Sequence, residues 1–147
     1  MARYVTTLRT DRSPRDVFTY MADLRNFAEW DPGVVKVQQV EGDGGGAGAV
    51  FDVSVKGPGR TIDLRYVTTT YEPSKNLLVV ARSSMFTSTD RVTVVADGTG
   101  SIVTYDADLQ LNGPLKLFDP LLKLSFGKIG DRAAAGLRRV LDGSPVG

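Results

Sequence analysis

The 147-residue sequence contains no cysteine and no histidine. Without cysteine it can form no disulfide, no thiolate nucleophile, no zinc ribbon and no cysteine-held iron–sulfur cluster. Without histidine it lacks the commonest general base and the residues of Ser-His-Asp, Cys-His and HExxH sites. A metal ion could be held only by carboxylate and carbonyl oxygens, and the sequence predicts neither a metal site nor a cofactor.

Neither sign of charge dominates, and no long hydrophobic run occurs. Lys and Arg number 18 against 17 Asp and Glu, a net charge of +1, whereas nucleic-acid binders normally carry a clear basic excess. Apolar runs such as 77–81 are far shorter than the roughly 20 residues of a membrane span. Charged residues stand near the N-terminus, where a signal peptide needs an apolar stretch. We therefore expect one soluble, cytoplasmic domain, residues 1–147, that binds no nucleic acid and does not insert stably into membranes.

The first third of the chain predicts a strand followed by two short helices. Arg3–Thr10 alternates and is rich in Thr and Val, as strands are. Ser13 is a good N-cap residue and Pro14 suits the first helical position. A second short helix is expected over Leu24–Trp30, because a proline and a glycine follow it.

The rest of the chain predicts antiparallel strands and then one long helix. Residues 34–111 alternate between apolar and polar side chains, with turn signals such as Asp97-Gly98 between the runs. Asp119 and Pro120 can begin an amphipathic helix. At 100° per residue, one face of this helix holds Leu121, Leu122, Ser125, Phe126, Ile129, Ala133, Gly136, Leu137 and Val140.

Together these elements indicate an α+β fold. An antiparallel sheet of six or seven strands is too wide for one helix to cover while flat, so it must curl around the long helix. Space that side chains leave unfilled between sheet and helix then forms a cavity.

The segment Ser13–Gly33 carries a family resemblance. It reads S-P-x-D-V-F-x-Y-M-A-D-x-x-x-F-x-E-W-D-P-G and resembles the opening of polyketide cyclase/dehydrase-like proteins of the START-like (Bet v 1-like, SRPBCC) superfamily. The Gly113–Leu115 segment before the basic helix is also similar to that family. The resemblance implies a helix-grip fold: a curved antiparallel sheet wrapped on a C-terminal helix around an apolar cavity. Family members include lipid and hormone carriers and aromatase/cyclases, so the fold alone does not choose a function.

Side chains expected on the inner face of the sheet and helix are the candidate ligand-binding residues. Each of them also fits an ordinary core position, but as a set they supply the apolar walls of a small-molecule pocket. Tyr66 and Tyr105 add hydroxyl groups, while Met85 and Phe86 stand at a strand junction that fits a cavity entrance. The full set is Phe51, Val53, Leu64, Tyr66, Met85, Phe86, Tyr105, Leu109, Leu122, Phe126 and Ile129.

Catalytic candidates are few. Most strand acids alternate out of phase with the apolar residues and are expected in solvent, namely Asp52, Asp63, Asp106 and Asp108. The phase of Arg82 and Asp90 is less clear: an inward Arg82 would orient a carbonyl or enolate, and an inward Asp90 would act as a base whose pKa burial raises. Tyr66 is the third candidate, as a group that polarises a carbonyl.

Two further patterns favour ordinary structural roles. Gly42, Gly44 and Ala47 match the loose dinucleotide-binding pattern G-x-G-x-x-[GA], but a strand pattern follows where that site needs a helix, so a hairpin loop is expected. The basic residues of the tail are spread around the helix, which indicates a solvated face or, alternatively, transient contact with an anionic membrane. They are Lys116, Lys123, Lys128, Arg132, Arg138 and Arg139.

The sequence therefore favours a protein that binds or carries a hydrophobic small molecule, such as a lipid, a polyketide or an aromatic compound, without covalent chemistry. A polyketide cyclase or aromatase type of enzyme is the first alternative. A regulatory or interaction module whose cavity is vestigial is the second.

Overall fold

The structure is a computed structural model that describes residues 2–57 and 59–146, with the side chains of 118, 119 and 121–124 outside the description. The predicted order of strand, short helices, strands and long helix is confirmed. The elements are β1 (Ala2–Thr10), α1 (Pro14–Ala22), η1 (Leu24–Asn26), α2 (Phe27–Trp30), β2 (Val34–Glu41), β3 (Val50–Gly57), β4 (Arg60–Glu72), β5 (Asn76–Arg82), β6 (Phe86–Asp97), β7 (Gly100–Leu111), η2 (Gly113–Phe118), α3 (Asp119–Val140) and β8 (Ser144–Pro145).

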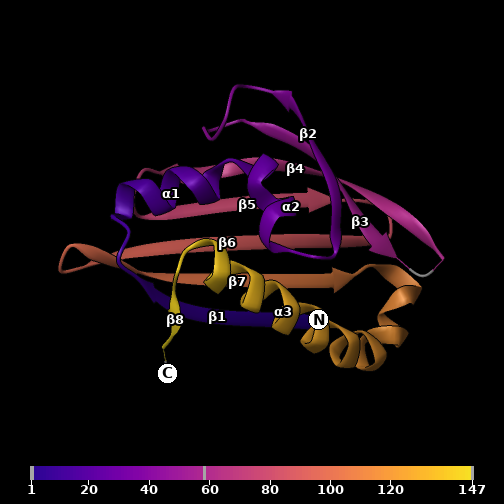
Figure 1. The fold of residues 1–147 in the computed structure, drawn as a ribbon. Coiled ribbons are helices and arrows are strands. Elements are labelled where there is room, and N and C mark those ends of the chain that lie inside the picture. The colour runs from indigo at the N-terminus through magenta and orange to yellow at the C-terminus, as the bar shows by residue number, and fades with distance from the viewer. Residues whose placement is uncertain (1, 58, 147) are drawn as a thin grey trace.

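The strands form one antiparallel sheet in the order β2-β3-β4-β5-β6-β7-β1-β8. All the helices lie on one face of it, which we call the inner face (Figure 1). The expected α+β helix-grip architecture is confirmed, with eight strands in place of the six or seven expected. The additional strand is the two-residue β8, which pairs with Leu8 and Arg9 of β1.

The start of α1 follows from local sequence chemistry. The Ser13 hydroxyl accepts a hydrogen bond from the Asp16 backbone N–H at 3.2 Å, and Pro14 occupies the first turn. This satisfies one of the backbone donors that a helix start leaves free. The buried side of α1 then carries Val17, Phe18 and Met21 toward the sheet.

Alternation along the strands divides the sheet into an apolar inner face and a charged outer face. Phe51 and Val53 of β3 are fully buried, and between them Asp52 points outward. Asp52 forms an ion pair with Arg65 of the neighbouring β4 at 2.7 Å. Arg3 and Asp106 form a similar outer-face pair between β1 and β7 at 2.7 Å.

Helix α3 packs on β1 and α2 with most of the face that the sequence predicts, since Ala133, Gly136, Leu137 and Val140 are buried or packed against the core. Its buried residues in the second half are Gly130, Ala134, Gly136 and Leu137. Ile129, expected on the buried face, is 47% exposed. The cause is a close approach at Gly130, where an added Cβ would lie 2.2 Å from the Tyr4 ring of β1. At Gly130 the helix is therefore in close contact with the sheet.

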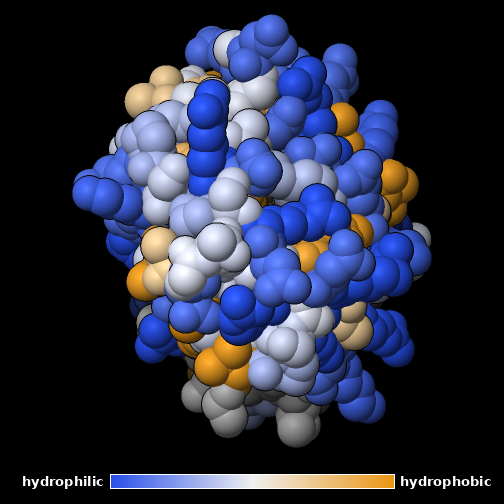
Figure 2. Space-filling view, turned by 60° about the vertical axis from the view of Figure 1, so that its left-hand side comes forward, coloured by the Kyte–Doolittle hydropathy of each residue, from blue (hydrophilic) through white to orange (hydrophobic). Residues whose placement is uncertain are grey.

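The surface is mostly hydrophilic on the side that Figure 2 presents, and its hydrophobic residues lie in small separate groups. Within the described part of the chain, none of the helices combines the length and apolar character that crossing a membrane requires.

Candidate functional site

A small cavity lies between the short helices and the inner face of β5, β6 and β7. Its volume is about 20 Å³, which is room for about one water molecule. The lining is mainly apolar and aromatic, with two carboxylates and one phenol. The lining residues are Met21, Asp23, Leu24, Phe27, Trp30, Leu77, Val79, Asp90, Val92 and Tyr105.

Two hydrogen-bonded pairs form a polar cluster on the inner face. Asp90, in β6, is only 5% exposed, and the Tyr105 hydroxyl of β7 donates a short hydrogen bond to its Oδ2. Ser88 precedes Asp90 by two residues on the same strand, so both side chains point to the same face. The Ser88 Oγ lies 2.8 Å from the Tyr66 hydroxyl of β4. We call Tyr66, Ser88, Asp90 and Tyr105 the inner-face polar cluster.

Burial controls the acidity of this cluster. The pKa of Asp90 is raised to about 7, mainly by loss of solvent and also by the charge of the nearby Asp31, while hydrogen bonds from Tyr105 and Ser88 oppose the shift. Burial, together with the charge of Asp90, also raises the pKa values of Tyr66 and Tyr105 well above that of a free phenol. The phenols therefore remain hydrogen-bond donors at neutral pH, and Asp90 is the group whose charge changes.

Aromatic side chains of α2 cover the cluster. Phe27 and Trp30 stack with ring centroids 4.7 Å apart. The Trp30 ring meets the Tyr105 ring edge to face at 5.2 Å, a favoured geometry for aromatic pairs. Trp30 is buried between the helices and the sheet, and it also lines the cavity.

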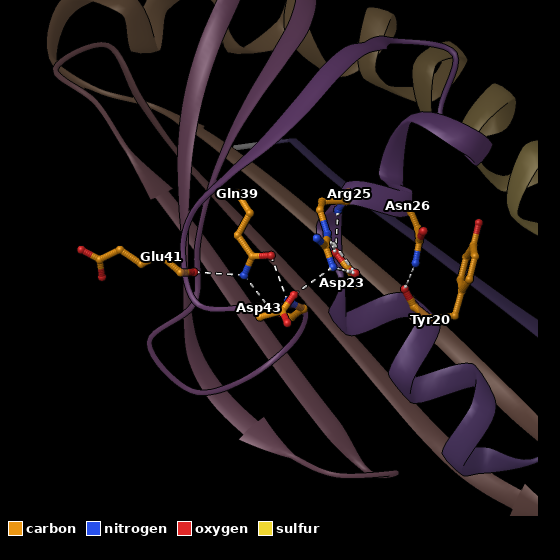
Figure 3. Close-up of polar contacts among 8 residues, drawn as sticks. Tyr20, Asp23, Arg25, Asn26, Gln39, Glu41 and Asp43 are labelled. Carbon is orange, nitrogen blue, oxygen red and sulfur yellow. Dashed lines mark hydrogen bonds and ion pairs between the residues drawn. The ribbon is translucent and has the colours of Figure 1, made fainter.

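A network of polar contacts fixes the cavity wall at η1, as Figure 3 shows. Asp23 caps η1 through the Arg25 backbone N–H and accepts two further bonds from the Arg25 guanidinium, at 2.9 and 2.7 Å. Hydrogen bonding by Arg25 lowers the pKa of Asp23, so this wall carboxylate stays ionised. Arg25 also lies 3.8 Å from Asp43 in the glycine-rich loop.

The glycine-rich loop is the hairpin loop that its sequence predicts. It joins β2 to β3, and a strand follows it, not a helix. The Gln39 side chain holds the loop by accepting from the Gly44 N–H at 2.9 Å and donating to the Gly44 carbonyl at 3.0 Å. Gly45 lies against Ala22, at the end of α1. The loop therefore supports the wall formed by α1 and η1.

The side chains on the inner face become less buried toward one end of the sheet. In β3, Phe51 and Val53 are fully buried but Val55 is half-buried. In β7, Val103 is fully buried, whereas Leu109 and Leu111 are half-buried. Ile62, at the start of β4, is half-buried as well. We call this region, with Val55, Ile62, Leu109 and Leu111, the open end of the sheet.

The candidate ligand-binding residues fall into three groups. Phe51, Val53, Leu64, Tyr66 and Phe86 belong to the buried core. Tyr105 and Leu109 are partly buried against that core, and Phe126 of α3 is half-buried. Met85 and Ile129 are 39% and 47% exposed, and the Leu122 side chain lies outside the described residues.

Two of the three catalytic candidates lie inside the protein and one is exposed. Asp90 and Tyr66 lie in the inner-face polar cluster. Arg82 is exposed at the end of β5, after the inward-pointing Ala81, so it does not reach the interior. The alternation of β5 places Leu77, Val79 and Ala81 inside, which leaves the even-numbered positions on the other face.

Sequence reasoning missed most of the cavity wall. Leu77, Val79 and Val92 alternate as inner-face residues should, so a signal for them existed. Phe27 and Trp30 stand three residues apart, on one side of a helical turn. No pattern in the sequence indicates that α1, η1 and α2 close over β5–β7.

Comparison with solved structures gives the same fold. A START superfamily protein from Mycobacterium smegmatis superposes with a TM-score of 0.76 at 14% identity, covering 97% of this chain and 98% of that one. A major latex-like protein from Panax ginseng gives 0.59 at 12% identity, covering 89% and 97%. The di-domain ARO/CYC StfQ from the steffimycin biosynthetic pathway gives 0.61 at 17% identity, covering 96% of this chain and 45% of that one.

A protein-family model matches almost the whole chain. No curated protein sequence matches this one significantly. The family model described as polyketide cyclase / dehydrase and lipid transport matches residues 1–142. The matched residues include the short helices, strands β1 to β7, helix α3 and the inner-face polar cluster. The chain therefore belongs to the polyketide cyclase / dehydrase and lipid transport family.

Proposed function

We propose that this protein binds a hydrophobic small molecule, such as a lipid, a polyketide or an aromatic compound, between the sheet and α3. The observation that carries the proposal is the open end of the sheet, where inner-face apolar side chains are only half-covered. In a filled core these positions would be as buried as Phe51 and Val53 on the same face. Half-covered apolar side chains that face inward provide the walls that such a ligand needs.

Solvent also reaches the inner face of the sheet beside the polar cluster. The side chain of Ala107 in β7 points to the inner face, as those of Tyr105 and Leu109 do, yet it is only half-buried. It is the cross-strand neighbour of Asp90. The inner face is therefore accessible at this small side chain, between the polar cluster and the open end. A ligand that enters from the open end would bring its head group to Asp90, and the 20 Å³ cavity lies on the far side of that group.

The family description supports the same function. It names lipid transport beside polyketide cyclisation, and one solved structure of the same fold is an ARO/CYC protein from a biosynthetic pathway. Both activities require that a hydrophobic molecule be held inside the protein.

A thermal-shift screen with a blocked variant tests the proposal. The panel contains fatty acids, sterols, flavonoids and aromatic polyketides. A ligand at 100 times its Kd adds about 2.7 kcal/mol, and at roughly 2–4 °C per kcal/mol this raises Tm by several degrees. Ala107→Phe fills the inner face and should abolish the shift, whereas Gln110→Phe adds the same ring to the outer face of β7 and should keep it.

Absence of any shift across the panel would contradict the proposal and favour an interaction module with a closed core. A shift that survives in Ala107→Phe would place the ligand elsewhere on the molecule.

A second candidate function, an enzyme of the polyketide cyclase or aromatase type, is favoured by the state of Asp90. A buried carboxylate whose pKa is about 7 is suited to take a proton from a carbon beside a carbonyl near neutral pH. The hydroxyl of Tyr66 could then donate a hydrogen bond to the carbonyl oxygen. Turnover of a linear poly-β-ketone mimic tests this: Tyr66→Phe should keep the thermal shift and lose turnover. Binding by the unmodified protein without turnover would exclude the enzyme and leave the carrier.

A further inference from the structure

The inner-face polar cluster contains one ionisable carboxylate, Asp90, and an ionised carboxylate accepts hydrogen bonds. Asp90 is almost completely buried, lines the cavity and already accepts a bond from Tyr105. An ionised carboxylate has two oxygens with about four acceptor sites, so the hydrogen bonds from Tyr105 and Ser88 leave further capacity. None of the described residues that line the cavity is Lys or Arg.

The surroundings of Asp90 disfavour a second negative charge. Asp31 lies close enough to raise the pKa of Asp90, and Asp23 stands in the wall of the same cavity. Charges interact more strongly in a protein interior than in water, and like charges placed together there are costly. A ligand carboxylate brought to Asp90 would meet repulsion and would find, in Tyr105, a hydroxyl already bonded to Asp90.

We propose that the site selects hydrophobic molecules whose head group donates hydrogen bonds, a hydroxyl or a protonated amine, and rejects hydrophobic carboxylates such as fatty acids. The donor bonds to the Asp90 carboxylate, and the apolar body of the molecule lies along the open end of the sheet. This inference rests on the proposed function, since it assigns a ligand class to the same interior.

Head-group chemistry can be isolated with four probes that share one ring system. The probes are 2-naphthylmethanol, 2-naphthylmethylamine, 2-methylnaphthalene and 2-naphthoate, with affinities measured by calorimetry at pH 8. Hydrogen bonds to charged groups contribute about 1.5–3 kcal/mol, or roughly ten- to a hundredfold. The alcohol and the amine should therefore bind at least about tenfold more tightly than the hydrocarbon, and the carboxylate should bind more weakly than the hydrocarbon.

Variants locate the effect at Asp90. Asp90→Asn should remove the advantage of the amine and raise the affinity for naphthoate. Asp52→Asn is the matched control, because it makes the same charge change on the outer face of the sheet, and it should keep the selectivity of the unmodified protein. Tyr105→Phe keeps the Asp90 carboxylate and should keep the preference for donors, which guards against misfolding of Asp90→Asn.

The outcomes separate this inference from the function on which it rests. If none of the four probes binds, the inference is overturned, and the thermal-shift panel decides whether the proposed function fails with it. If the hydrocarbon or naphthoate binds as tightly as the alcohol and the amine, interior binding stands and the selectivity is refuted. A preference for donors that persists in Asp90→Asn would equally overturn the role of this carboxylate.

Discussion

Replacing Asp90 with Asn should make the folded chain more stable, and the gain should be clearly larger at pH 8 than at pH 5. The free carboxyl titrates at 3.8, and burial raises its pKa to about 7 in the folded protein. Between these values the folded chain holds a proton that the unfolded chain has lost, so ionisation favours unfolding as pH rises. At about 1.4 kcal/mol per pKa unit, the loss between pH 5 and pH 8 is about 3 kcal/mol.

Urea denaturation at the two pH values measures this difference. Few other groups titrate between pH 5 and pH 8, because the chain has no histidine, the side chain that ordinarily titrates in this range. The pKa values of Asp31 and Asp108 are also raised. Both groups are present in each protein, so the comparison of variant with parent reports the removal of the Asp90 charge together with its interaction with Asp31. Asp52→Asn is the control variant, because it removes a carboxylate from the outer face of the sheet and leaves Asp90 in place.

The parent should lose about 3 kcal/mol of unfolding free energy between pH 5 and pH 8, and Asp90→Asn should lose much less. Equal losses in the two proteins would refute the reasoning, because they would mean that water reaches Asp90 and that its folded and unfolded pKa values are alike.

Other substitutions test individual contacts. Thr68→Val removes a buried hydroxyl that has no partner among the described residues, so unfolding free energy should rise by about 1 kcal/mol; a decrease would reveal a partner. Gly130→Ala places a Cβ 2.2 Å from the Tyr4 ring and should cost about 1–3 kcal/mol. Gly127→Ala, with nothing within 4 Å, should instead gain up to about 1 kcal/mol, and equal effects would contradict the close contact. Ser13→Ala removes the cap of α1 and should cost about 1 kcal/mol, read as a lower Tm that Ser13→Asp restores.

Local sequence chemistry was enough to predict most of the fold. The cap at Ser13 and the proline after it mark the start of α1 where the structure has it. The alternation around Phe51 and Val53 assigns the inner face of β3 correctly. These features depend on neighbours in the chain, which is why the sequence shows them. The two-residue β8 depends on the path of the chain after α3, and no periodicity indicates it.

The candidate site was predicted less completely, because tertiary contacts decide it. Phe86, Val92 and Val94 set the inward phase of β6, and this phase also places Asp90 inside; the polar residues between them weakened the signal. On α3, hydrophobic periodicity predicted Leu137 and Val140 on the packed face correctly, whereas Ile129 is exposed and Gly130 is the residue that approaches β1. The closure of the short helices over β5–β7 likewise has no counterpart in the local sequence.

The most direct test of interior binding is to locate a bound probe by nuclear Overhauser effects between 2-naphthylmethanol and the isotope-labelled protein. The account predicts contacts from the probe to Leu109, Leu111 and Tyr105, with none to the exposed Val95 on the outer face. Trp30 is the only tryptophan and lines the cavity, so its indole signal should shift on binding. Saturable binding with contacts to Val95 and an unchanged Trp30 signal would contradict the account.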